Sequence, residues 1–141
     1  MSLFVFDTDI FTHYRHGLPV VVRRIVQHAV GHRLALPVPV VDELISGWQA
    51  SFRRARVTPA QLAYFQSQFA EVVELMAGFE ILPMTAGSLA RHAALMAAKL
   101  QVKSPDLRIA AVALEASGIV VTRNLRDFRR VPGLICEDWS V

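Results

Sequence analysis

Residues 104–128 read Ser-Pro-Asp-Leu-Arg-Ile-Ala-Ala-Val-Ala-Leu-Glu-Ala-Ser-Gly-Ile-Val-Val-Thr-Arg-Asn-Leu-Arg-Asp-Phe and predict one helix that leads into one strand. Ser104 is a typical N-cap residue, Pro105 suits the first helical position, and apolar residues then recur at helical spacing. The pair Ser117-Gly118 is expected to end the helix. Residues 119–121, Ile-Val-Val, have the length and composition of a buried strand.

The position of Asp106 follows from this helix and strand. If the strand belongs to a parallel sheet, the helix before it runs antiparallel to it, so the helix begins at the edge where the strand ends. Asp106 lies in the first helical turn and is therefore expected to face the segment Thr122-Arg123-Asn124. A carboxylate at this position also interacts favourably with the helix dipole. We expect Asp106 at the rim of the sheet, beside a polar loop.

The N-terminus shows a second strand that ends in acidic residues. Residues 3–6, Leu-Phe-Val-Phe, are followed directly by Asp7-Thr8-Asp9. Ligand sites of open parallel sheets lie beyond the carboxyl ends of the strands. Capping of the next helix by Asp9 or Thr8 explains part of this pattern. For Asp7 we favour a functional role, because one acid ends this strand and another is expected at Asp106.

Two further helical patterns carry candidate metal ligands. One predicted helix carries Asp42 and Glu43, both of which can complement its dipole; Glu43 is also on the strand-exit side and is kept as a site residue. Near the end of an earlier helical pattern, residues 19–30, which Gly31 is expected to terminate, His28 and His32 stand four residues apart. Because neither a Cys nor a third His lies at a fitting spacing, we interpret this pair as part of a solvated helix face.

The composition indicates one domain with a high apolar content. At 141 residues the chain can bury roughly two-thirds of its unfolded surface around one core. Hydrophobic residues make up 53%, yet no run approaches the roughly 20 apolar residues that span a bilayer, so we expect no membrane association and a partner interface instead. The net charge of +3 is compatible with a nucleic-acid ligand without identifying one. The single Cys136 and the absence of a signal-like N-terminus predict a cytoplasmic protein without disulfides.

The order of the expected elements predicts an α/β fold. Strands alternate with helices or helix pairs along the whole chain, 1–141, as in a central parallel sheet covered on both faces. Asp7, Glu43 and Asp106 then meet at one edge of the sheet. Such a cluster repels itself unless a cation lies within it, and hard oxygen ligands select Mg²⁺ or Mn²⁺ rather than Zn²⁺. The pattern is typical of a metal that activates water for in-line attack on a phosphodiester.

The motifs of the C-terminal half resemble a known family. Pro-Asp-x-x-Ile-Ala-Ala at 105–111, Val-Thr-Arg-Asn-x-x-Asp-Phe at 121–128 and Val-Pro-Gly-Leu at 131–134 resemble PIN-domain proteins, and specifically the VapC toxins of bacterial toxin–antitoxin pairs. The resemblance covers nearly the whole chain, from 6 to 139. It implies a PIN-like three-layer α/β/α fold and a magnesium-dependent ribonuclease that cleaves RNA in single-stranded loops.

The resemblance also assigns roles to individual residues. Asp7 and Asp106 look like the principal metal ligands, and Glu43 looks like a support for the metal or its water. The family's fourth acidic position is occupied by Asn124, with Asp127 one turn beyond, so that role is assigned jointly to these two residues. The expected catalytic set is therefore Asp7, Glu43, Asp106, Asn124 and Asp127.

Two further expectations concern departures from the family pattern and the partners. The family often has Asn where this chain has Asp9, which adds negative charge to the site, and Thr122 is expected to form a hydrogen bond within it. The resemblance implies a VapB-type antitoxin whose apolar segment lies on the helices between Pro59 and Leu100 and whose tail approaches the acidic pocket. The excess of apolar residues, notably Phe65, Phe69 and Met96, motivates this expectation together with the resemblance. We also expect a homodimer.

Three alternative functions come from other protein classes. Asp7-Thr8-Asp9 after a strand also resembles the nucleophile loop of haloacid-dehalogenase phosphatases, which need a distal Lys and a second acidic pair. Lys103 instead precedes the helix, and Glu137 occupies the strand end at which a phospho-receiver domain has a Lys. A PIN fold used only as a catalytically inactive scaffold is the strongest non-enzymatic alternative, although such a scaffold would typically have lost its acids.

Overall fold

A five-stranded parallel sheet forms the centre of the molecule. The computed structural model describes residues 1–54 and 58–141. All four neighbouring strand pairs are parallel, in the spatial order β3-β2-β1-β4-β5. The strands are β1 (Leu3–Phe6), β2 (Arg33–Pro37), β3 (Glu80–Leu82), β4 (Ile119–Val121) and β5 (Ile135–Glu137).

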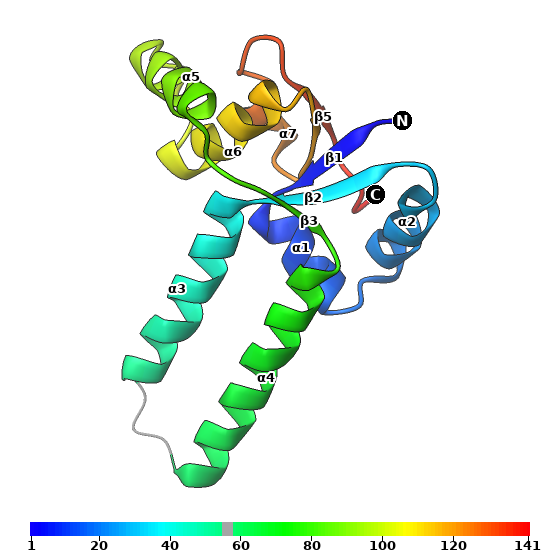
Figure 1. Cartoon of the computed structure of the whole chain (residues 1–141), viewed down its shortest axis with the longest axis vertical. Coiled ribbons are helices and arrows are strands. Elements are labelled where there is room, and N and C mark those ends of the chain that lie inside the picture. The colour runs from blue at the N-terminus through cyan, green and yellow to red at the C-terminus, as the bar shows by residue number, and fades with distance from the viewer. Residues whose placement is uncertain (55–57) are drawn as a thin grey trace.

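Helices cover both faces of the sheet. In the described ranges they are α1 (Thr8–Arg15), α2 (Pro19–Ala29), α3 (Val38–Arg54), α4 (Pro59–Ala77), α5 (Ala86–Ala97), α6 (Ser104–Glu115) and α7 (Leu125–Phe128). Right-handed crossovers place helices on opposite faces when the strand order reverses direction, as it does between β3 and β4. Figure 1 shows α5 and α6 on the side of the sheet away from α1 and α2. The predicted three-layer α/β/α fold with a central parallel sheet is confirmed.

The reversal of strand order creates a switch point between β1 and β4. Phe6 is in register with Val121, and the amide of Asp7 continues the ladder by donating to the carbonyl of Val121 at 3.1 Å. On the other side of β4, the amide of Thr122 donates to the carbonyl of Glu137 at 2.9 Å. The carboxyl ends of β1, β4 and β5 therefore lie together, which is where open α/β sheets bind ligands.

An aromatic cluster closes the core beside β1. The Trp139 side chain is fully buried, with ring centroids 4.9 Å from Phe4 and 5.3 Å from Phe6. His28 stacks on Trp139 at 4.4 Å, and His32 packs edge-on against Phe4 at 5.5 Å. Both histidines are half-buried. Their interpretation as part of a solvated face is therefore wrong: α2 ends at Ala29, and His28 near that end and His32 just before β2 both pack against the aromatic cluster.

The helix predicted from residues 104–128 is present, with one correction at its start. Ser104 is already helical, and the N-cap position belongs to Lys103, whose side chain makes no capping hydrogen bond. At the other end Ser117 adopts a positive φ of 56°, and the chain then passes close to β1 at Gly118. A Cβ atom on Gly118 would lie 2.7 Å from Cγ2 of Val5. Glycine therefore allows α6 to turn closely into β4.

Helices α3 and α4 form a hairpin that extends beyond the sheet (Figure 1). Phe52 of α3 packs against Phe65 and Phe69 of α4 at centroid distances of 6.2 and 6.1 Å, and Trp48 lies 6.1 Å from Phe69. Phe65 and Phe69 therefore help to pack α4 against α3 and are only half-buried. In the part of the chain that the structure describes, no helix is both long and apolar enough to cross a membrane.

The aromatic cluster around Trp139 should contribute much of the stability of the core. Trp139→Ala should lower the free energy of unfolding by about 3–5 kcal/mol, because it leaves a cavity between Phe4, Phe6 and His28. Trp139→Phe retains most of the apolar contact and should lower it by less. Urea unfolding followed by circular dichroism measures both. A Trp139→Ala variant as stable as the wild type would contradict this account of the core.

Candidate active site

Asp7 links the N-terminal strand to the C-terminal half of the chain. Its side chain is 6% exposed, and it caps α1 because Oδ1 accepts a hydrogen bond of 2.9 Å from the amide of Ile10. Oδ2 accepts a hydrogen bond of 2.5 Å from the hydroxyl of Thr122, at the end of β4. Capping by Asp9 or Thr8 is therefore excluded, since both lie inside α1. The expected hydrogen bond of Thr122 within the site is present.

Burial changes the acidity of Asp7. Loss of solvent contact raises the pKa of its carboxyl from 3.8 to about 6, although the hydrogen bonds from Thr122 and Ile10 act in the opposite direction. The negative charges of Asp9 and Asp106 raise the pKa further. The fold therefore holds a carboxylate in surroundings that disfavour its charge, which is typical of functional sites.

Asp106 is the second acid with a raised pKa. It lies half-buried in the first turn of α6, as the sequence predicted, and burial is the main reason that its pKa rises. The neighbouring charges of Asp127 and Glu43 add to this effect, whereas Lys103 and the side chain of Asn124 oppose it. Three other residues of the predicted catalytic set, Asp127, Glu43 and Asn124, therefore lie near enough to Asp106 to change its pKa.

Glu43 reaches the site from α3. Its side chain is exposed, and its Oε2 accepts a hydrogen bond of 2.7 Å from the hydroxyl of Thr8. Thr8 is the first residue of α1, directly after Asp7. This contact fixes the start of α3 against the start of α1. From the sequence we assigned no role to Thr8 beyond capping, although its position between two acids at a strand end was a signal.

The loop after β4 places Asn124 and Asp127. The hydroxyl of Thr122 accepts a hydrogen bond of 2.9 Å from the amide of Asn124, the N-cap residue of α7. The Asn124 side-chain amide in turn donates to Oδ2 of Asp127 at 2.9 Å. Asp127 also lies 3.5 Å from Arg130. A continuous set of hydrogen bonds therefore runs from Asp7 through Thr122 and Asn124 to Asp127.

The predicted catalytic residues are neighbours, but they do not form a ready-made metal cage. They come from the end of β1, from α3, from the start of α6 and from the β4–α7 segment. Within residues 1–54 and 58–141, no group of three or more His, Cys, Asp or Glu side chains is arranged to hold a metal ion. The chemistry of the donors nevertheless suits a hard divalent cation, because the gathered side chains offer oxygen ligands and repel one another without a cation.

A groove of about 450 Å³ leads away from this acidic cluster. It begins at Thr8 and Glu43 and follows the space between α1 and α3 to Trp48 and Phe65. Arg15 lines it as well, with its guanidinium 5.2 Å from the centre of the Trp48 ring. The groove is therefore acidic at one end and aromatic at the other, a feature that the sequence did not indicate.

A comparison with protein-family models shows which family this arrangement belongs to. The model of the PIN domain matches residues 4–134, which is most of the chain. The protein is a member of the PIN-domain family. No match to this PIN domain was found among curated proteins.

Solved structures of toxin–antitoxin complexes share the fold of this PIN domain. Chains of Salmonella typhimurium VapBC bound to DNA and of nontypeable Haemophilus influenzae VapBC-1 each match with a TM-score of 0.79, at 23% and 19% identity, over 99% of both chains. A chain of Rickettsia felis VapBC2, bound to a DNA fragment from the promoter, matches with a TM-score of 0.77 at 22% identity, over 97% of this chain and 98% of that one. At these identities the likeness establishes the fold alone.

The raised pKa of Asp7 makes the stability of the metal-free PIN domain depend on pH. The folded carboxyl takes up its proton near pH 6, whereas the unfolded one does so near 3.8, so protonation favours the folded state. Relative to Asp7→Asn, the wild type should therefore lose roughly 3 kcal/mol of stability as the pH rises from about 4 to about 7. Below and above this window the difference between the two proteins should be constant.

Urea unfolding in chelator at a series of pH values tests this prediction. Asp42→Asn is the matched control, because it neutralises an exposed acid of α3 and should leave the pH dependence of the wild type in place. If the stability difference between wild type and Asp7→Asn does not change between about pH 4 and pH 7, the Asp7 carboxyl is not disfavoured by burial.

Proposed function

We propose that this PIN domain is a magnesium-dependent endoribonuclease and the toxin of a VapBC-type toxin–antitoxin pair. The observation that carries the proposal is the buried Asp7 at the switch point of the sheet, with Asp106, Glu43, Asn124 and Asp127 around it. Membership of the PIN family supports a nuclease over a haloacid-dehalogenase phosphatase or a phospho-receiver domain. An inactive PIN scaffold remains the alternative that the experiment below separates from an enzyme.

The proposed cation ligands are Asp7, Asp106 and Glu43, with Mg²⁺ or Mn²⁺ as the metal. A bound divalent cation supplies Lewis-acid stabilisation of the negative charge on a phosphodiester under attack. Thr122 holds the Asp7 carboxylate in place, and Thr8 does the same for Glu43. Asn124 and Asp127 share the fourth position at the edge of the site. These hydrogen bonds limit the movement of the Asp7 and Glu43 carboxylates, while the complete ligand set would assemble around the cation.

The proposed antitoxin binds in the groove between α1 and α3. An extended or helical apolar segment fits against Leu44, Trp48 and Phe65, and a cationic residue that follows it would meet Glu43 at the acidic end. Such a segment would cover the route to the catalytic residues. This proposal moves the docking site from the helices between Pro59 and Leu100 toward α1 and α3, because Phe65 is the one described residue of that range that lines the groove. The neighbouring VapBC structures support a protein partner of this kind.

Asp106→Asn should remove magnesium-dependent cleavage of RNA while the fold remains intact. The substitution deletes one charge from the ligand set without changing the side-chain volume. It also removes the repulsion that Asp127 and Glu43 exert on this half-buried carboxylate, so the fold is not weakened. Loss of a metal ligand or an electrostatic group of this type lowers the rate by about 10²-fold or more. Gel analysis of total RNA incubated with Mg²⁺ or with chelator measures the effect.

Asp42→Asn provides the control for cleavage, because Asp42 is an exposed acid next to Glu43 in the sequence. It should retain the wild-type rate, and melting curves should show that both variants are folded. A wild type that leaves RNA intact with Mg²⁺ and Mn²⁺ would instead favour the inactive scaffold. Wild-type cleavage by a folded Asp106→Asn variant would remove Asp106 from the site.

Gly47→Leu should block the groove without harming the fold. Gly47 lines the groove in the middle of α3, and a Cβ atom there meets nothing within 4 Å. Leucine also has a helix propensity roughly 0.8 kcal/mol better than glycine. The variant should therefore fold at least as stably as the wild type, yet bind the antitoxin about 2 kcal/mol more weakly.

Co-expression with the product of the adjacent reading frame, followed by pull-down and calorimetry, measures this effect. Gly47→Ala is the matched control, since it improves helix propensity in the same way but adds only one methyl group. Equal binding by wild type, Gly47→Ala and Gly47→Leu would show that the partner docks elsewhere on the molecule.

A further inference from the structure

Arg123 is held in a defined position at the edge of the site by a histidine. It follows Thr122 and precedes Asn124, both members of the hydrogen-bonded set that begins at Asp7. Its Nη1 donates a hydrogen bond of 2.7 Å to Nε2 of His13, on α1. A guanidinium has only donors, so Nε2 of His13 is the acceptor of this hydrogen bond. The contact joins the segment after β4 to α1.

The partner of Arg123 distinguishes it from other arginines of the described residues. Arg33, Arg91 and Arg130 form ion pairs with Glu80, Glu115 and Asp127, so their charges are largely compensated. Arg123 is instead oriented by an imidazole nitrogen, and it is exposed. This acceptor carries no negative charge, so it fixes the direction of the guanidinium without compensating its positive charge. The remaining N–H groups are therefore available to an anionic ligand.

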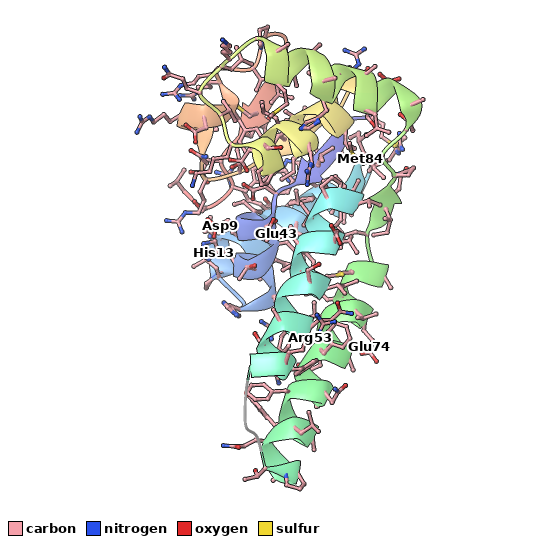
Figure 2. The ribbon with its side chains drawn as sticks, turned by 90° about the vertical axis from the view of Figure 1, so that its left-hand side faces the viewer. Asp9, His13, Glu43, Arg53, Glu74 and Met84 are labelled. Atoms are coloured by element: carbon pink, nitrogen blue, oxygen red, sulfur yellow. The ribbon has the colours of Figure 1, made fainter. Side chains whose placement is uncertain are left out.

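The position of this pair relates it to the acidic cluster. His13 lies one turn after Asp9 on α1, with Nε2 at 3.8 Å from an Asp9 oxygen. Figure 2 shows Asp9 and His13 on the same side of the molecule as Glu43. Glu43 in turn touches Thr8 at the start of α1. An anion bound by Arg123 would therefore lie beside the acidic cluster rather than inside it.

We propose that Arg123 binds a phosphate of the RNA adjacent to the one that is cleaved, and that His13 positions its guanidinium for this contact. The proposal rests on the proposed ribonuclease function and adds a substrate-positioning residue to it. A guanidinium presents several N–H groups in a planar fork that matches two phosphate oxygens, so it fixes both position and orientation of the strand. The contact reads the backbone and not the bases.

Binding of a short fluorescent single-stranded RNA in chelator tests the contact without cleavage. Arg123→Gln should weaken binding about tenfold at low salt, and it should reduce the slope of log Kd against log salt concentration by about 0.7. Arg23→Gln is the matched control, because it removes the same charge from an exposed position on α2. Arg123→Lys keeps the charge but not the planar fork of N–H groups, so its affinity for the RNA should lie between those of the wild type and Arg123→Gln.

Two His13 variants test the positioning role. His13→Gln retains a side-chain oxygen that can accept from Arg123, and it should keep most of the affinity. His13→Leu removes the acceptor and should weaken binding in the same direction as Arg123→Gln. In cleavage assays with Mg²⁺, both Arg123→Gln and His13→Leu should raise KM with little change in kcat, since the contact is present in ground and transition states alike.

The outcomes separate this inference from the function on which it rests. If the wild type cleaves RNA but Arg123→Gln matches Arg23→Gln in affinity and salt dependence, Arg123 does not bind a phosphate and the nuclease proposal stands. If His13→Leu binds as the wild type does, the positioning role of His13 is wrong. If the wild type neither binds nor cleaves RNA, both the ribonuclease and the Arg123 contact are overturned.

Discussion

The hydrogen bond from Thr122 to Asp7 connects the two halves of the molecule at the point where catalysis is proposed. It joins the end of β1 to the end of β4, two strands that are neighbours in the sheet but more than a hundred residues apart in the chain. The same hydroxyl accepts from the amide of Asn124 and so fixes the loop into α7. The orientation of the Asp7 carboxylate and the order of the C-terminal loop therefore both depend on the Thr122 side chain.

The site stores electrostatic repulsion that the rest of the fold must offset. Burial raises the pKa of Asp7 to about 6, and Asp106 is pushed in the same direction by burial and by its acidic neighbours. A sheet whose central strand β1 is buried throughout, together with the aromatic packing around Trp139, supplies stability at a distance from these acids. A cation or a cationic partner residue that enters the cluster would relieve the repulsion, so ligand binding and stability are coupled.

The α3–α4 hairpin serves two roles through different side chains. Phe52, Phe65 and Phe69 hold the two helices together outside the central sheet. Nearer the N-terminus of α3, Gly47 and Trp48 form part of one wall of the groove. Glu43 lies at the end of the groove that meets the acidic cluster. An occupant of the groove would contact the catalytic region through α3 itself. The geometry thus relates the proposed antitoxin-binding groove to the proposed chemistry without requiring a conformational change.

The sequence by itself determined the fold class and the position of Asp106, because apolar periodicity and strand-ending acids are local patterns. The PIN motifs added the family. Only the tertiary structure decided that Asp7 rather than Asp9 caps α1, that His28 and His32 join the core, and that Arg123 meets His13. Each of these depends on which side chains from distant segments face one another, and that is set by strand register and helix packing rather than by neighbours in the chain.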